Sequence, residues 1–219
     1  MPRALFEKTG DAVWMSHLDL MRVFQRAFKR AGLPLTHTQG FNPRPSVSIA
    51  LPLSVGVQSR CELLDFDLVD CDASCEEICD RLNIALVDGV QVLTVYNDGR
   101  KVRDLSLLNC TVTLEYDNGL PGDAAAKIEK LFASQELTVE KKGKNGIVEQ
   151  DIIPMICRME IEQPDANTCT IKALICCQNP TLNPAQMVAA LEKYMPELCP
   201  DHARYCRNEI YTTNEKVFR

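Results

Sequence analysis

Residues 62–96 read ELLDFDLVDCDASCEEICDRLNIALVDGVQVLTVY, and they place one helix pattern between two strand patterns. The segment ELLDFDL has an apolar residue at every second position, as a strand with one buried face does. Ser74, followed three residues later by Glu77, is the start signal of a capped helix, which continues through Leu86. VQVLTVY then follows as a second strand. This succession is the closing half of a βαββαβ unit.

The residues before this stretch predict the opening half of the same unit. Residues 3–8 and 12–15 are expected to form one strand with a bend between them. Ser16 can cap a helix that Gly32 ends. The helix has an apolar stripe of Leu20, Phe24, Ala27, Phe28 and Ala31. SVSIALPL, residues 46–53, supplies the next strand because its apolar residues alternate.

The second half of the chain has nearly the same order. We expect strands at 107–116, 156–162, 168–177 and 205–212. Helices are expected to begin at Asp123 and at Asn183, where Pro184 and Gln186 complete a start signal. The dipeptide NG at 145–146 lies between LTVEKK and IVEQDI and predicts a hairpin.

Two βαββαβ units in succession predict an α+β protein built of tandem ferredoxin-like (βαββαβ) sandwiches. The first domain is expected to span residues 1–100 and the second residues 105–219. The polar, turn-rich segment NDGRKVRD, residues 97–104, is the expected linker. Because this topology hosts many unrelated functions, it indicates no chemistry by itself.

Charge is distributed unevenly along the chain. Residues 1–60 carry eight lysines and arginines against three acids, whereas the remainder carries sixteen against twenty-seven. A protein with a formal charge of -6 can therefore still bind an anion through its first part. The sequence contains no apolar run of about 20 residues and no signal-peptide pattern at its start. We expect a cytoplasmic protein without a membrane partner, with its eleven cysteines reduced.

The cysteines Cys71, Cys75 and Cys79 raise the alternative of an iron–sulfur site. The radical S-adenosylmethionine (radical SAM) motif spaces its cysteines as C-x3-C-x2-C, and position 82 here is leucine. Cys75 and Cys79 instead share one helical face with Ile78 and Leu82, which favours packing in a core. We therefore expect no metal and no cofactor.

The helix predicted after Ser16 carries cations on one face. Arg22, Arg26, Lys29 and Arg30 recur at i, i+4, i+7 and i+8, and Asp19 is the only acid in the helix. A solvated face is one interpretation, because surface helices commonly carry charge. Stabilising helix pairs mix the two signs, however, and four cations on one face can hold a phosphate backbone.

A stiff loop, QGFNPRP at residues 39–45, follows this helix. Its two prolines push Asn42 and Arg44 into extended conformations, so both side chains are presented at low entropic cost. Phe41 is expected to fill the core, with stacking on a base as the alternative. The predicted binding residues are His17, Arg22, Arg26, Lys29, Arg30, His37, Gln39, Phe41, Asn42 and Arg44.

No catalytic motif was found in the sequence. It lacks the G-x-S-x-G, Walker, G-x-G-x-x-G and H-E-x-x-H patterns. A general-base role of His17 or His37 is an alternative, as is metal binding by both histidines with Asp19, for which ligands from a helix start and a loop are a weak signal. We favour a protein that is not an enzyme.

Three motifs in residues 6–60 carry a family resemblance: SHLDL with Arg22 and Arg26, GFNP at 40–43, and ALPLSVG at 50–56. They resemble the opening of the radical-SAM-associated (radical-SAM-linked) proteins, a domain of unknown function, and EQDIIPMI at 149–156 is similar more loosely. Those proteins occur alone or at the C-terminus of radical SAM proteins, with genes near those of an RNase E/G-type ribonuclease and of ribosomal proteins. The resemblance implies an accessory role beside a radical SAM enzyme on a separate chain.

These observations predict a non-catalytic adaptor that binds RNA or a ribosome-related ribonucleoprotein and acts with a radical SAM enzyme. One alternative is a metal-independent endoribonuclease of the CRISPR repeat-processing type. Those nucleases are similar in architecture, but their glycine-rich C-terminal loop has no counterpart in residues 205–219. The other alternative is a pure protein–protein docking module for the radical SAM partner.

Overall fold

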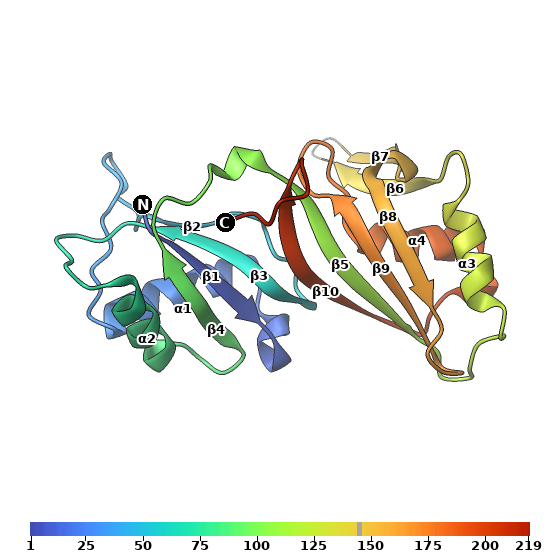
Figure 1. The fold of residues 1–219 in the computed structure, drawn as a ribbon, viewed down its shortest axis with the longest axis horizontal. Coiled ribbons are helices and arrows are strands. Elements are labelled where there is room, and N and C mark those ends of the chain that lie inside the picture. The colour runs from blue at the N-terminus through green and yellow to red at the C-terminus, as the bar shows by residue number, and fades with distance from the viewer. Residues whose placement is uncertain (144–145) are drawn as a thin grey trace. The chain divides into compact units, whose positions relative to one another are not determined.

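The computed structural model of the protein describes residues 1–143 and 146–219, which divide into two compact units. Unit 1 contains residues 1–102 together with Arg219, and unit 2 contains residues 103–218. In the described residues, each unit combines an antiparallel sheet with two α-helices (Figure 1). The α+β class predicted from the sequence is confirmed.

Unit 1 has the element order β-α-β-β-α-β. Its elements are β1 (Arg3–Lys8), α1 (His17–Arg30), β2 (Val47–Ile49), β3 (Val57–Phe66), α2 (Cys75–Ala85) and β4 (Val90–Tyr96). The strands lie in the order β4-β1-β3-β2, and each neighbouring pair is antiparallel.

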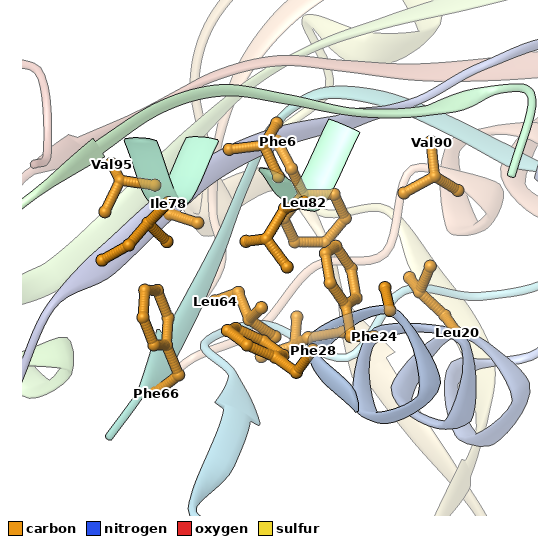
Figure 2. Packing of buried hydrophobic residues seen from close by; sticks show 14 of the residues in the cluster. Phe6, Leu20, Phe24, Phe28, Leu64, Phe66, Ile78, Leu82, Val90 and Val95 are labelled. Carbon is orange, nitrogen blue, oxygen red and sulfur yellow. The ribbon is translucent and has the colours of Figure 1, made fainter. Parts of the chain in front are cut away.

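The core of unit 1 lies between its sheet and its two helices (Figure 2). The helices contribute Leu20, Phe24, Phe28, Ile78 and Leu82, and the strands contribute Phe6, Leu64, Phe66 and Val92 among others. The rings of Phe6 and Phe24 meet edge to face, with their centroids 4.7 Å apart. Burial of each such side chain stabilises the fold by about 1.5–3 kcal/mol. This packing fixes which face of α1 points to solvent.

Unit 2 has the same order with one hairpin added. Its elements are β5 (Leu105–Glu115), α3 (Ala124–Phe132), β6 (Thr138–Gly143), β7 (Gly146–Asp151), β8 (Ile156–Glu162), β9 (Thr168–Cys176), α4 (Ala185–Tyr194) and β10 (His202–Thr212). The main sheet has the order β10-β5-β9-β8, and β6 and β7 pair separately. Asn145, the first residue of the predicted NG turn, lies outside the described residues, but the pairing of β6 with β7 confirms the predicted hairpin.

Residues 12–15 are not a strand, contrary to the sequence prediction. A 3-10 helix, η1, covers Gly10–Trp14 instead, because Gly10 adopts a φ of 54° that turns the chain out of β1. The buried Lys8 side chain stabilises this turn, since its Nζ donates to the carbonyls of Val13 and Met15 at 3.1 Å each. A short apolar run fits a strand or a buried helical turn equally well, which explains the error.

The strand predicted over residues 46–53 is also shorter than expected, because β2 ends at Ile49. Leu51 and Leu53 are buried, but from an irregular segment rather than a strand. Pro52 between them has no N–H to donate to a sheet ladder, which accounts for the early end. Alternating burial was therefore predicted correctly, and the hydrogen bonding was not.

Candidate nucleic-acid interface on unit 1

Helix α1 begins at a formed cap and turns its charged face to solvent. The Asp19 N–H donates to Ser16 Oγ at 3.2 Å, and Ser16 Oγ donates to the Asp19 carboxylate at 2.7 Å. Because Leu20, Phe24 and Phe28 face the core, the helical period places the cations on the outside. The exposed cations of α1 are Arg22, Arg26, Lys29 and Arg30.

The four cations differ in their partners. The Arg22 guanidinium forms an exposed ion pair with Asp19, 3.0 Å long. Hydrogen bonds from Ser16 and Arg22 lower the pKa of Asp19, so its carboxylate is charged at neutral pH. Among the described residues, Arg26 and Lys29 have no side-chain hydrogen bond or ion pair. These two side chains are the free cations of α1.

Arg30 makes a structural contact where the C-terminal ends of α1 and α2 meet. Its guanidinium donates to the carbonyl of Ala85, the last residue of α2. In return, Arg81 of α2 donates to the carbonyls of Ala31 at 3.0 and 2.6 Å and of Gly32 at 2.9 Å. Each helix thus supplies a cation to the carbonyl end of the other, where the helix dipole is negative. Arg30 is also one of the predicted phosphate-binding residues, and in the structure its guanidinium makes this capping contact.

The predicted loop forms the tip of a longer loop. The two sides of this longer loop, which we call its limbs, are hydrogen-bonded to each other. Its limbs are joined by Thr38 N–H donating to the Arg44 carbonyl at 2.8 Å and by Arg44 N–H donating to Thr38 Oγ1 at 3.0 Å. One limb is also fixed to the end of β3, because Thr36 N–H donates to the Asp67 carbonyl at 2.9 Å. Residues 39–43 at the tip are all exposed. The limbs therefore hold Gln39, Asn42 and Arg44 in solvent on an anchored base.

Phe41 does not fill the core, contrary to the sequence prediction. It lies at the tip, and its exposed fraction is 111%. The core near this segment is already filled by Phe28 and Phe66, whose ring centroids lie 4.9 Å apart. The alternative role of Phe41, stacking on a base, is compatible with this exposure.

A pocket of about 360 Å³ lies between α1 and the limbs of the loop. Gln25, Lys29 and His37 provide its polar groups, while Phe28, Leu35 and Pro45 are among its apolar walls. None of its lining residues is acidic. An apolar pocket with a few polar groups is the usual form of a small-ligand site. We call it the α1–loop pocket.

The predicted site residues converge only in part. Lys29 and His37 line the α1–loop pocket, and Arg44 lies on the limb next to it. His17 begins α1 and is twelve residues from Lys29, which corresponds to about 18 Å along the helix axis. Its Nδ1 is buried and has no hydrogen-bond partner in the described residues. His17 and His37 therefore do not form a pair around one phosphate.

The sequence analysis missed Gln25 as a member of the site. Gln25 precedes Lys29 by four residues and so lies beside it on the helix, which was a usable signal. Apart from Phe28, the apolar walls could not be assigned, because they come from residues 33–35 and from Pro45, after the helix has ended. Their position depends on the contact between Thr36 and Asp67, 31 residues apart.

The cysteines that suggested a cluster pack against the core of unit 1. Cys71, Cys75 and Cys79 are half-buried at its edge, and burial raises the pKa of the Cys79 thiol. In residues 1–143 and 146–219, no group of three or more His, Cys, Asp or Glu side chains is arranged to hold a metal ion. The core-packing interpretation accounts for the placement of these cysteines.

A second, larger pocket of about 630 Å³ lies on the sheet of unit 2. Asn208 donates there to Asn109 Oδ1 at 3.0 Å and to Thr111 Oγ1 at 2.9 Å. The two cations in its lining, Arg158 and Lys172, have acidic partners at 2.6 and 2.7 Å. Because these cations are already neutralised, the free positive charge of α1 makes unit 1 the stronger candidate for binding an anion.

The fold and this surface define a two-unit α+β protein with a cationic helix face beside a small pocket. The chain belongs to the family described as an uncharacterized protein conserved in bacteria (DUF2344), whose model matches residues 2–196. A comparison with curated proteins finds no match.

Twenty-four chains of solved structures match this chain, and two of them are compared with it. A chain in the "Crystal Structure of a Cbf5-Nop10-Gar1 Complex" is 8% identical, with a TM-score of 0.53 over 95% of this chain. This chain spans 48% of that chain's length, so the likeness concerns the fold of about half of it. An unknown protein from Galdieria sulphuraria is 12% identical over 94% of this chain and 96% of that chain, with a TM-score of 0.25. The second likeness is too low to support a comparison of folds.

Proposed function

We propose that the protein is a non-catalytic accessory protein that binds RNA or a ribonucleoprotein through α1 and the adjacent loop. The observation that carries this proposal is the pair of free cations, Arg26 and Lys29, on an exposed helix face. They lie beside an anchored loop that presents Phe41, Asn42 and Arg44 to solvent. Phosphate contacts from cations and stacking on an exposed ring are the two usual elements of single-strand binding.

Three further assignments belong to the same proposal: the fold of each unit, the partner protein and the location in the cell. We propose that both units are ferredoxin-like sandwiches, since in each the first strand is central and pairs with the third and fourth. A radical SAM enzyme on a separate chain is the proposed partner, and it rests on the sequence resemblance alone. No helix in the described part of the chain is long and apolar enough to cross a membrane, and we propose a cytoplasmic location.

RNA binding is tested by the salt dependence of affinity. For single strands, log K falls with log salt by about 0.7 per phosphate contact. We expect binding of a fluorescein-labelled 20-nucleotide RNA to weaken between 50 and 200 mM KCl. In the variant Arg26→Glu/Lys29→Glu, the slope should be smaller by about 1.4, because two contacts are lost.

The matched control is Arg60→Glu/Lys101→Glu, which makes the same change in charge at two exposed positions outside α1. Its affinity should remain close to that of the wild type. Equal losses in the two variants would show that net charge, rather than the α1 face, governs binding. Absence of RNA binding in the wild type would contradict the proposal and favour the protein-docking alternative.

The endoribonuclease alternative makes a separate prediction. Either His17 or His37 would act singly, since His17 begins α1 whereas His37 lines the α1–loop pocket beside Lys29. Incubation of the purified protein with cellular RNA and a metal chelator should leave the RNA intact under our proposal. Cleavage that is lost in either His17→Ala or His37→Ala would favour the enzyme instead.

A further inference from the structure

We infer that the α1–loop pocket takes one unpaired nucleobase of a single-stranded RNA, with Lys29 at the adjoining phosphate. This inference rests on the proposed RNA binding and specifies its substrate class as single-stranded. It is carried by the size, the lining and the place of the pocket. Each of these can be tested apart from the general affinity for phosphate.

The size of the pocket suits a base. At about 360 Å³ it falls at the low end of the range of ligand pockets, about 300–1,000 Å³. Leu33, Pro34, Leu35 and Pro45 form apolar walls, and the buried Phe28 forms part of the lining from the core side. Such walls favour a nucleobase because they remove the apolar face of its ring from water.

The polar groups of the pocket match the chemistry of a nucleotide. The Gln25 amide both donates and accepts, as the edge of any nucleobase does. His37 contributes an imidazole that can stack or form a hydrogen bond. Lys29 adds a positive charge, and the lining contains no acid that would repel a phosphate.

The place of the pocket connects it to the cationic face of α1. Arg26 precedes Lys29 by three residues, so the two side chains are neighbours on the helix surface. A strand whose base enters the pocket can therefore continue along Arg26 and Arg22. In a duplex the bases are stacked and paired, so a base-sized pocket selects a single strand.

The limbs that form the pocket are held by contacts within unit 1. An isolated antiparallel β-bridge joins His37 on one limb to Pro45 on the other. A second β-bridge joins Leu35 to Leu68, which follows β3. Ser46 N–H also donates to the Thr36 carbonyl at 2.8 Å. Little ordering is then required on binding, which favours measurable affinity for a short oligonucleotide.

The test compares fluorescein-labelled octauridylate and octaadenylate with an abasic octamer that keeps the same ribose-phosphate backbone. We expect at least one base-containing octamer to bind roughly 5- to 100-fold more tightly than the abasic octamer, as one accommodated base contributes. A duplex carrying the same number of phosphates per strand should bind more weakly than the better octamer. Gln25→Trp, which fills the pocket, and Gln25→Ala should both remove most of this base-dependent advantage.

The controls are Gln91→Trp and Gln91→Ala, because Gln91 is exposed on β4 and away from the pocket lining. These variants should keep the full difference between base-containing and abasic octamers. Thermal melting of all four variants checks that each is folded. Lys29→Gln should weaken binding of the base-containing and abasic octamers by the same factor.

Two results would overturn the inference while leaving the proposed function in place. One is equal binding of base-containing and abasic octamers, with both weakened in Arg26→Glu/Lys29→Glu. The other is a base-dependent advantage that persists in Gln25→Trp, which would move the base to another position such as the exposed Phe41. Failure of every oligonucleotide to bind would overturn the inference and the proposed function together.

Discussion

At the scale of single residues, charge on α1 separates into structural and free groups. Arg30 and Arg22 have partners in the fold, whereas Arg26 and Lys29 do not among the described residues. A run of four cations in a sequence therefore does not give four equal contributions to binding. Lys8 is the extreme case, because it is fully buried and holds the turn that precedes α1.

Replacement of Lys8 tests this structural role. In Lys8→Met the carbonyls of Val13 and Met15 lose their shared donor, so we expect the free energy of unfolding to fall by about 3 kcal/mol. Urea denaturation followed by circular dichroism measures the change. Lys101→Met at an exposed position should change stability by less than about 0.5 kcal/mol. A Lys8→Met protein as stable as the wild type would contradict the stabilisation of this turn by Lys8.

At the scale of elements, the two helices of unit 1 hold each other through their carbonyl ends. Arg81 makes three hydrogen bonds to the end of α1, and Arg30 makes one to the end of α2. Gly32 allows this close approach, because it has a φ of 64° and an added Cβ would lie 3.0 Å from Arg81 Nη2. The orientation of α1, and with it the cationic face, depends on this arrangement.

This arrangement predicts opposite effects for two arginines of the same helix. Arg30→Met should lower the free energy of unfolding by about 1 kcal/mol, since it loses a capping bond, and leave RNA affinity within about twofold. Arg26→Met should leave stability unchanged and weaken RNA binding. Urea denaturation and fluorescence anisotropy on both variants check the pair. A larger loss of affinity in Arg30→Met than in Arg26→Met would refute the assignment.

The elements were largely predictable, and their contacts were not. The α1 stripe and its Ser16 cap are local signals, and they were found from the spacing of residues alone. By contrast, Arg30 meets Ala85 across 55 residues, and Thr36 meets Asp67 across 31. No pattern in one chain specifies such pairs, so the α1–loop pocket and the capping role of Arg30 required the structure. Phe41 was misplaced for the same reason, since its burial depended on a neighbouring core that was already full.

At the scale of the whole molecule, buried thiols are concentrated where they affect the stability of unit 2. Burial raises the pKa of Cys110 on β5 to about 12 and that of Cys169 on β9 to about 11. Burial also raises the pKa of Tyr116. All three residues belong to unit 2. The two units should therefore respond differently to alkaline conditions.

The expected pH dependence follows from the direction of these shifts. The folded protein holds the Cys110 proton more tightly than the unfolded chain, in which the thiol pKa is about 8.5. The stabilisation is complete below that pH and is lost as the pH rises toward about 12, at up to about 1.4 kcal/mol per pH unit for one thiol. Calorimetric melting in reductant at pH 8, 9 and 10 measures the loss. Cys110→Ala should show a smaller slope, whatever its absolute stability, and an unchanged slope would contradict the role of this thiol.

The exposed loop tip has a consequence for how the family diversifies. Because the side chains of Gln39, Phe41 and Asn42 contribute nothing to the core, exchanges at these three positions are close to neutral for folding, whereas Gly40 has a φ of 139° that a larger residue would strain. Gly32 and Arg81 are constrained by the fold. Gly32 permits the close approach of the two helices, and Arg81 makes the hydrogen bonds between them. Selection at these tip positions can therefore act on ligand binding without a cost in stability. Under the proposed RNA binding, differences at Gln39, Phe41 and Asn42 between relatives would reflect a change of ligand, whereas coupled changes at Gly32 and Arg81 would reflect only a restored contact within the fold.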